Sequence, residues 1–180
     1  MLELDRLVIT QDDFRLTADL TVPTGARIAV VGPSGAGKST LLSVISGFFP
    51  AESGRIRWQG QDITETAPGA RPLSILFQDQ NLFPHLTVAQ NVGLGLRPDL
   101  RLTAEERARV AGALARTGLQ GLEDRRPGTL SGGQQSRVAL ARVLLRARPL
   151  MLLDEPFAAL GPALKDEMLN LVAEIAGETG

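Results

Sequence analysis

The chain has 180 residues, of which 43% are hydrophobic and 22% are charged, and its formal net charge is -1. These values describe one ordinary domain, or two small subdomains that share a core, and they exclude a disordered chain. A charge this close to zero argues against a nucleic-acid-binding surface, and the lack of cysteine excludes disulfides and thiolate zinc sites. The apolar runs stop far short of the roughly 20 residues that span a bilayer, so we expect any membrane role to be peripheral.

The N-terminal part is expected to contain strands around one helix. Leu2 to Val8 alternates apolar and polar residues, Phe14 to Val22 does so more loosely, and both patterns predict antiparallel strands. The β-branched run from Arg27 to Val31, closed by Gly32, predicts a buried parallel strand. Thr40 to Gly47 has apolar residues at helical spacing, so this strand and helix would form the first half of a βαβ unit.

Strands and helices alternate in the rest of the chain. Strands are predicted at Arg55 to Gln59, Leu73 to Phe77 and Leu150 to Leu153, and helices at Ala104 to Thr117, Gln134 to Ala147 and Pro162 to Ala176. Thr103 is the expected N-cap of the first of these helices. The alternation indicates an α/β fold with a parallel sheet, and a stretch without strand patterns, from about Val88 to Gly128, indicates a helical subdomain.

A phosphate-binding loop is predicted directly before the first helix. Its residues match G-x-x-x-x-G-K-[ST] and are Gly32, Pro33, Ser34, Gly35, Ala36, Gly37, Lys38, Ser39 and Thr40. The glycines let the backbone curl so that successive N–H groups point at an anion, and the helix N-terminus adds partial positive charge. Lys38 would reach the β and γ phosphates of a nucleotide, and the Ser39 hydroxyl would coordinate Mg²⁺. The alternative is a glycine-rich turn that happens to precede a lysine.

Two carboxylates follow the predicted strand from Leu150 to Leu153. They lie at the carboxyl end of that strand, where open α/β sheets place their ligands. Asp154 would hold Mg²⁺, directly or through water, and Glu155 would be the general base that orients the attacking water. An Asp-Glu pair alone is a weak signal, since such a pair often only begins a loop, but the phosphate loop strengthens it.

A third motif, Leu130-Ser131-Gly132-Gly133-Gln134, opens the helix that carries Arg137 and Arg142. Ser131 can cap this helix, and the two glycines let a phosphate approach the backbone N–H groups. A phosphate loop, this L-S-G-G-Q sequence and a strand with Asp-Glu together resemble the nucleotide-binding subunits of ABC transporters. The resemblance covers essentially the whole chain. It implies a P-loop NTPase (RecA-like) parallel core at 1–87 and 148–180 with an antiparallel β subdomain, and a helical signature subdomain at 88–147.

The resemblance also implies partners. A head-to-tail homodimer would sandwich two ATP molecules, each between the Lys38 loop of one subunit and Ser131, Gly132, Gly133 and Gln134 of the other. Gln78 matches the family's Q-loop glutamine, which is expected to contact Mg²⁺ and the attacking water. The apolar segment from Asn81 to Val88 would dock a transmembrane permease, so His85 is an interface or surface residue. A periplasmic binding protein would act indirectly, and the subunit would lie on the cytoplasmic face of the inner membrane.

Four departures from the family pattern bear on the site. The aromatic residue expected to stack on adenine is replaced: Gln11 occupies its place, and Phe14 is the candidate substitute. Gln135 and Ser136 follow the signature in place of the usual Arg-Gln, and Gly161 stands where the family has an aspartate. The fourth departure is the end at residue 180, before the strand and switch histidine of the family, which predicts that the C-terminal part is missing and that turnover is low.

The segment from Leu76 to Leu96 resembles most the ATP-binding subunits of bacterial thiamine importers. Importers of ferric iron, sulfate, molybdate or polyamines are alternatives, because no residue of such a subunit touches the cargo. Two further classes stay open: a soluble ABC ATPase of DNA repair or translation, and a nucleotide-binding subunit with little turnover. The first usually has a Cys-x-x-Cys hook, long coiled-coil insertions or two cassettes in one chain, and none of these is found in the sequence.

Overall fold

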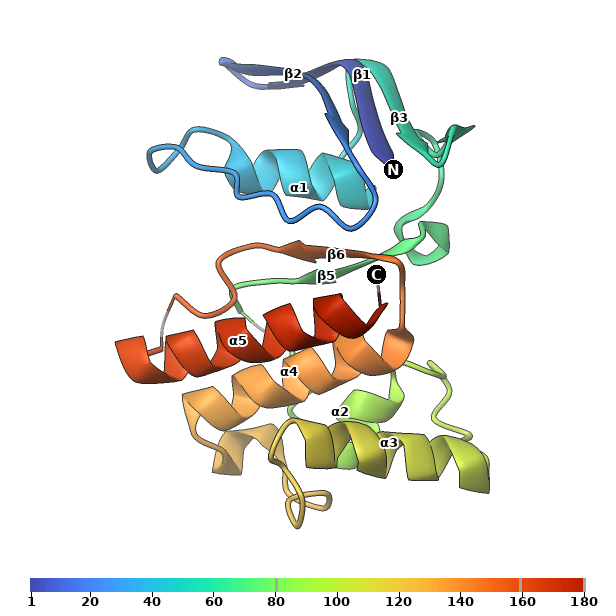
Figure 1. Ribbon diagram of the computed structural model, residues 1–180, viewed down its shortest axis with the longest axis vertical. Helices are drawn as coiled ribbons and strands as arrows, with labels where there is room; N and C mark the ends of the chain where they lie inside the picture. Colours follow the sequence, from blue (N-terminus) through green and yellow to red (C-terminus); the bar gives the residue numbers. More distant parts are fainter. Residues whose placement is uncertain (80, 159, 180) are drawn as a thin grey trace. The chain divides into compact units, whose positions relative to one another are not determined.

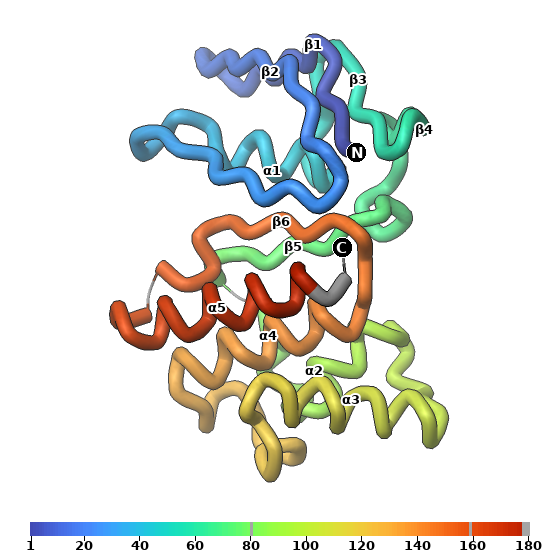
Figure 2. The backbone as a smooth tube through the Cα atoms, in the orientation of Figure 1, coloured from blue at the N-terminus to red at the C-terminus, as the bar shows by residue number. Residues whose placement is uncertain are grey.

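A computed structural model describes residues 1–79, 81–158 and 160–179 (Figures 1 and 2). Two positions in segments considered above, Gln80 and Ala159, lie outside the described residues, as does the C-terminal Gly180. The chain divides into two compact units, Met1–Leu73 and Ser74–Thr179. The finer division into a core at 1–87 and 148–180 and a helical subdomain at 88–147 stays a prediction.

The first unit contains a four-stranded sheet in the order β2-β1-β3-β4 (Figure 1). Its strands are β1 (Leu2–Gln11), β2 (Phe14–Val22), β3 (Ser53–Trp58) and β4 (Gln61–Asp62), and all their pairings are antiparallel. Helix α1 (Lys38–Ser46) follows the predicted phosphate loop, and a 3-10 turn spans Pro68–Ala70. The predicted antiparallel β subdomain is therefore confirmed.

A bulge in β1 decides which of its side chains are buried. Leu2 and Leu4 alternate as expected, but the pairing register shifts between Leu4 and Leu7, and Arg6 takes a φ of 45°. The shift keeps Leu7 in the core, where it is fully buried. Gly54 lies opposite the bulge with a φ of 89°, and a Cβ there would overlap the Arg6 carbonyl oxygen. Only glycine fits this position, because the φ is left-handed and the backbones are in contact.

The prediction of a buried strand from Arg27 to Val31 is wrong. These residues belong to neither sheet, and Ile28, Val30 and Val31 are 57%, 49% and 91% exposed. A strand forms only where a neighbouring strand pairs with its N–H and C=O groups and other elements cover its side chains. Neither sheet of the described residues takes up this segment, so α1 is preceded by a loop and not by the strand of a βαβ unit.

The second unit is helical apart from one pair of strands. The strands are β5 (Leu73–Leu76) and β6 (Leu150–Leu153), and the helices are α2 (Val88–Gly93), α3 (Ala104–Arg116), α4 (Gly132–Arg146) and α5 (Pro162–Thr179), with a 3-10 turn at Pro127–Thr129. Asp154, directly after β6, donates its N–H to the carbonyl of Leu76, the last residue of β5, at 2.9 Å. The carboxyl ends of the two strands therefore lie together, and the pair is parallel.

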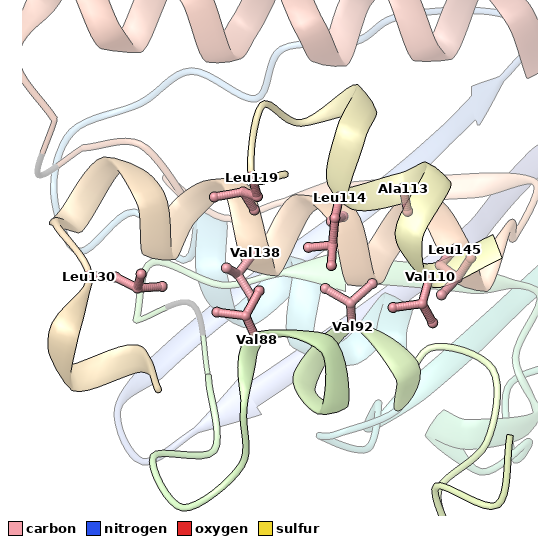
Figure 3. Close-up of a cluster of buried hydrophobic side chains, with 10 residues drawn as sticks. Val88, Val92, Val110, Ala113, Leu114, Leu119, Leu130, Val138 and Leu145 are labelled. Atoms are coloured by element: carbon pink, nitrogen blue, oxygen red, sulfur yellow. The ribbon is translucent and has the colours of Figure 1, made fainter. Parts of the chain in front are cut away.

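Two hydrophobic clusters hold the helices of the second unit together. The first joins α2, α3 and α4 (Figure 3) and consists of Val88, Val92, Val110, Ala113, Leu114, Leu119, Leu130, Val138, Ala141 and Leu145. The second joins β5, α4 and α5 and consists of Leu76, Ala139, Leu140, Val143, Phe157, Met168 and Ile175. Helix α4 contributes to both clusters, which is why its apolar residues occupy more than one face.

The element ends follow local signals. Thr103 caps α3 as predicted, since its hydroxyl accepts from the N–H of Glu106 in a reciprocal capping box. Gly47 ends α1 with a φ of 83°, also as predicted. Helix α4 starts two residues before the predicted start at Gln134, and α5 extends to Thr179, beyond the predicted end at Ala176. Over the described residues, no helix combines the length and apolar character needed to cross a bilayer.

Candidate functional site: a nucleotide-binding loop and a signature helix

The backbone of the predicted phosphate loop has the curled form that anion binding requires. Gly35 and Gly37 have φ values of 80° and 84°, and Gly37 is the N-cap of α1. The N–H of Ala36 donates to the carbonyl of Pro33 at 3.3 Å and closes a turn. Helix α1 follows with nine residues, so its partial positive charge falls on the loop.

Lys38 lies across the loop. Its ammonium group donates to the carbonyls of Gly32 and Pro33, both at 3.0 Å. The side chain thus folds back over the glycines and is half-buried. A phosphate group bound in the loop would meet the Lys38 ammonium, the N-terminus of α1 and the backbone N–H groups of the curled loop. The residues present therefore fit a nucleotide phosphate. Ser39 is exposed in the first turn of α1, next to half-buried Thr40.

Phe14 packs against the loop. A Cβ on Gly37 would overlap the Phe14 ring and would lie 3.0 Å from a methyl group of Leu16. Both side chains come from β2 and are half-buried. Gln11 pairs with Phe14 across the β1–β2 turn and is exposed. Of the two residues considered for the missing aromatic contact, the structure brings Phe14 to the loop.

Arg71 supports the other end of α1. It is only 3% exposed, and its guanidinium donates to the carbonyls of Val44 and Ile45 at 2.9 and 2.7 Å and of Thr64 and Thr66 at 2.6 and 2.8 Å. A cation at the C-terminus of α1 is favoured by the helix dipole. Burial lowers the pKa of Arg71, although Glu65 acts in the opposite direction. No sequence motif marks Arg71 for this role.

In the second unit, the carboxyl end of the β5–β6 pair brings three predicted site residues to one edge. Asp154 and Glu155 follow β6, and Gln78 lies in a turn just after β5, where it is exposed. Glu155 has a φ of 46°, a left-handed conformation that costs a non-glycine residue of the order of 1 kcal/mol. The pair of strands therefore sets both carboxylates and the Gln78 amide just beyond the carboxyl ends of two neighbouring strands.

The signature residues form a reciprocal cap on α4. The Ser131 hydroxyl accepts from the N–H of Gln134 at 3.3 Å, and the Gln134 side chain accepts from the N–H of Ser131 at 3.0 Å. Gly132 is exposed, whereas Gly133 is buried. The first N–H groups of a helix have no partner within it, and of the two glycines the exposed one, Gly132, is the one that an anion can approach from outside.

The two unusual residues after the signature make local contacts. The Gln135 side chain donates to the carbonyls of Pro127 and Leu130 at 3.1 and 3.3 Å, and the Ser136 hydroxyl donates to the carbonyl of Gly132 at 3.1 Å. Gln135 therefore fastens the loop before the signature, and Ser136 bonds back within the first turn of α4.

A buried and a half-buried polar residue, Asn91 and Arg142, organise the segment from Asn81 to Val88, and neither was singled out for this role from the sequence. Asn91, fully buried, accepts from the N–H of Phe83 at 2.8 Å and donates to the carbonyls of Phe83, Leu86 and Thr87 at 3.0–3.3 Å. Arg142 of α4 donates to the carbonyl of Asn81 at 2.9 Å, and burial lowers its pKa. Phe83 and His85 are exposed, with their rings edge to face at 6.0 Å.

The predicted metal ligands are oxygen donors: a hydroxyl in Ser39, an amide in Gln78 and a carboxylate in Asp154. This donor set suits Mg²⁺, which prefers oxygen and usually keeps waters and substrate phosphates among its ligands. Within residues 1–79, 81–158 and 160–179, no group of three His, Cys, Asp or Glu side chains could hold a metal by itself. The chemistry of the predicted ligands therefore fits an ion that is bound together with a nucleotide.

A curled glycine loop with its lysine, before a helix, together with two carboxylates after a parallel strand, defines a P-loop nucleotide-binding protein. The ABC transporter family model matches residues 16–158. The chain belongs to the ABC transporter family, and it is an ATPase of the ABC type with the P-loop NTPase fold.

Named relatives and solved structures agree with this assignment. Proteins named "Thiamine import ATP-binding protein ThiQ" from Cereibacter sphaeroides and Ruegeria sp. are 66% and 57% identical to the whole chain, which spans 78% of each of them. The ATP-binding cassette MJ0796, a dimer in a post-hydrolysis state with ADP and Pi, is 28% identical with a TM-score of 0.85. That match covers 100% of this chain and 84% of the other. A nucleotide-free cassette of an ABC transporter has a TM-score of 0.88 at 28% identity, over 98% of this chain and 77% of that one.

Proposed function

We propose that this chain binds ATP with Mg²⁺ and hydrolyses it to drive a bacterial importer whose cargo is thiamine or its phosphates. The observation that carries the ATP site is the loop from Gly32 to Thr40, where Lys38 crosses curled glycines at the start of α1. The cargo is inferred from relatives of up to 66% identity that are named for thiamine import.

In this proposal each predicted site residue has one task. The loop from Gly32 to Thr40 binds the phosphates of ATP, and Lys38 turns from the Gly32 and Pro33 carbonyls to the β and γ phosphates. Ser39, Gln78 and Asp154 would hold Mg²⁺, which when bound would neutralise charge on the phosphates. Glu155 accepts a proton from the attacking water, and Gln78 helps to orient that water.

The proposed assembly is a head-to-tail homodimer beneath a permease. Ser131, Gly132, Gly133 and Gln134 of one subunit complete the ATP site of the other, an arrangement supported by the dimeric cassette solved with ADP and Pi. The exposed rings of Phe83 and His85 suit contact with a coupling element of the transmembrane permease. The subunit would then lie peripherally on the cytoplasmic face of the inner membrane, with a periplasmic binding protein on the other side.

Replacing Ser131 by Arg should leave ATP binding by the monomer unchanged and block the ATP-dependent dimer. A long cation at this position obstructs the approach of the partner's nucleotide, whereas the subunit's own loop is untouched. The measurement is ATP affinity by titration together with the mass of the complex in solution.

Ser131→Ala is the matched control, because the arginine also removes the cap of α4. Loss of the cap alone costs about 1 kcal/mol of stability, so Ser131→Ala should melt earlier. It also removes one hydroxyl from the partner's ATP site but adds no cation, so it should weaken the ATP-dependent dimer less than Ser131→Arg does. Weak ATP binding by the Ser131→Arg monomer would contradict the sandwich arrangement.

Phe14 is proposed to contact the adenine base, because it is the aromatic residue that lies against the loop. Phe14→Ala should weaken ATP binding by roughly 5- to 10-fold, the loss of one stacking contact worth about 1 kcal/mol. Phe14→Tyr should bind ATP normally, and binding of inorganic triphosphate should be equal in all three chains. A Gln11→Ala chain with the larger loss would assign the base contact to Gln11 instead.

The cargo can be tested in vesicles that contain the permease encoded beside this gene and its binding protein. Thiamine with its binding protein should raise ATP hydrolysis by this subunit, and sulfate, molybdate, ferric iron or polyamines with the same protein should not. Stimulation by one of these others would reassign the cargo. No hydrolysis under any condition would favour a nucleotide-binding subunit with little turnover.

A further inference from the structure

Gly133, near the start of α4, contacts helix α5. This contact gives Gly133 a packing role in addition to its predicted role in phosphate binding. A Cβ built on Gly133 would overlap a methyl group of Leu164, whereas a Cβ on Gly132 would meet no atom within 4 Å. The backbone of Gly133 is buried and that of Gly132 is exposed. The φ of Gly133 is not left-handed, so the space taken by Leu164, and not backbone conformation, is what a side chain at this position would meet.

The contact continues along both helices. Arg137 lies four residues after Gly133 on α4, and Glu167 lies three residues after Leu164 on α5. The Arg137 guanidinium donates to the Glu167 carboxylate at 2.6 Å. Further on, fully buried Met168 of α5 belongs to one cluster with Ala139 and Leu140 of α4. The first turn of α4 therefore lies in a fixed register on the first turn of α5.

We propose that Leu164 is a positioning residue for the signature: it seats the first turn of α4, and Gly133 is glycine so that Leu164 fits. This inference rests on the proposed function, because it assumes that the N–H groups of this turn face a nucleotide. Helix α5 begins directly after the loop that carries Glu155. Leu164 therefore packs α5, the helix that follows the Glu155 loop, against the first turn of α4, which is proposed to meet the partner's ATP.

Alanine should act differently at Gly132 and at Gly133. An alanine at Gly132 points into open space, so it affects only what approaches from outside. An alanine at Gly133 pushes against Leu164 and displaces the turn from within. Shortening Leu164 should therefore repair Gly133→Ala and should have no such effect on Gly132→Ala.

The first experiment is a double-mutant cycle in thermal melts, without nucleotide. Gly133→Ala should lower the Tm by roughly 4–10 °C, as overpacking does, whereas Gly132→Ala should leave it within about 2 °C. Leu164→Ala should lower the Tm in the wild-type chain but raise it in the Gly133→Ala chain. Absence of this reversal of sign would overturn the proposed packing.

The second experiment measures ATP-dependent dimerisation, with every variant made in a Glu155→Gln chain to prevent turnover. Gly133→Ala should weaken the dimer at least about 10-fold, and adding Leu164→Ala should restore it to within about 3-fold. Gly132→Ala should also weaken the dimer, because its methyl group faces the approaching nucleotide. Adding Leu164→Ala should not restore the dimer in that chain. A reversal in the melts without recovery of the dimer would leave Leu164 a packing residue and overturn its positioning role.

The two experiments distinguish this inference from the proposed function. If the Glu155→Gln chain itself forms no dimer with ATP, the sandwich is wrong, and the positioning role falls with it. The melts then still decide whether Leu164 is the reason for glycine at position 133, because they involve no nucleotide.

Discussion

Replacing Glu155 by Gln should lower the rate of ATP hydrolysis by roughly 10²-fold or more while ATP still binds. The amide has the size of the carboxylate and can donate and accept hydrogen bonds, but it cannot take a proton from water. Glu155 is exposed at the carboxyl end of β6, so the substitution removes no buried partner. Phosphate release from the purified chain measures the rate, and nucleotide titration measures the binding.

The ATP-bound dimer should accumulate in the Glu155→Gln chain, because hydrolysis would no longer separate the subunits. Gln adopts the φ of 46° at this position about as readily as Glu, so the change in unfolding free energy should stay within about 0.5 kcal/mol. Glu174→Gln, at an exposed position of α5, is the matched control and should hydrolyse ATP normally. Normal turnover in the Glu155→Gln chain would assign the role of base to another group.

Helices and strands whose ends and apolar spacing are marked by their own residues could be predicted from the sequence. Helix α3 has a cap at Thr103, acidic residues in its first turn and regular apolar spacing, and it lies where the sequence puts it. Strand β6 is a short apolar run with a definite end, and its predicted bounds are those observed. In both cases the residues that define the element are neighbours in the chain.

The segment from Arg27 to Val31 shows why other elements could not be predicted in this way. Its β-branched residues have the composition of a buried strand, yet Val31 is 91% exposed. Composition reports a tendency, whereas a strand also needs hydrogen-bonded neighbours from elsewhere in the chain. Arg6 is a second example: the apolar and polar alternation breaks there, but the bulge that the break reflects depends on Gly54 in another strand.

The same distinction applies to the site. The phosphate loop and the signature are contiguous motifs, and the structure gives both the local form that their roles require: a curled loop and a capped helix. Arg71 bonds backbone carbonyls of α1 that lie 26 and 27 residues away, and Leu164 fills the space left by the absent side chain of Gly133. Asn91 bonds nearer partners, within eight residues, but these too are backbone groups. Carbonyl groups and glycines are common to all sequences, so no residue pattern marks such partners.

Replacing Lys38 by Ala should abolish tight ATP binding. A hydrogen bond between charged groups is worth about 1.5–3 kcal/mol, so the loss of even one such contact weakens binding by roughly 10- to 150-fold. The structure adds a second effect, because Lys38 also bonds the Gly32 and Pro33 carbonyls at 3.0 Å and so holds the loop together. Titration with a nucleotide analogue that resists hydrolysis measures the affinity directly.

Two control chains separate these effects. Lys165→Ala removes the only other lysine, from an exposed position of α5, and should bind ATP normally. Lys38→Arg keeps the charge but brings a wider, planar group to a loop that closes around a compact ammonium, so it should recover only part of the affinity. If Lys38→Ala bound ATP as tightly as the unchanged chain, the loop from Gly32 to Thr40 would not be the nucleotide site. An unchanged Tm with lost affinity would instead assign the whole effect to the missing contact with the phosphates.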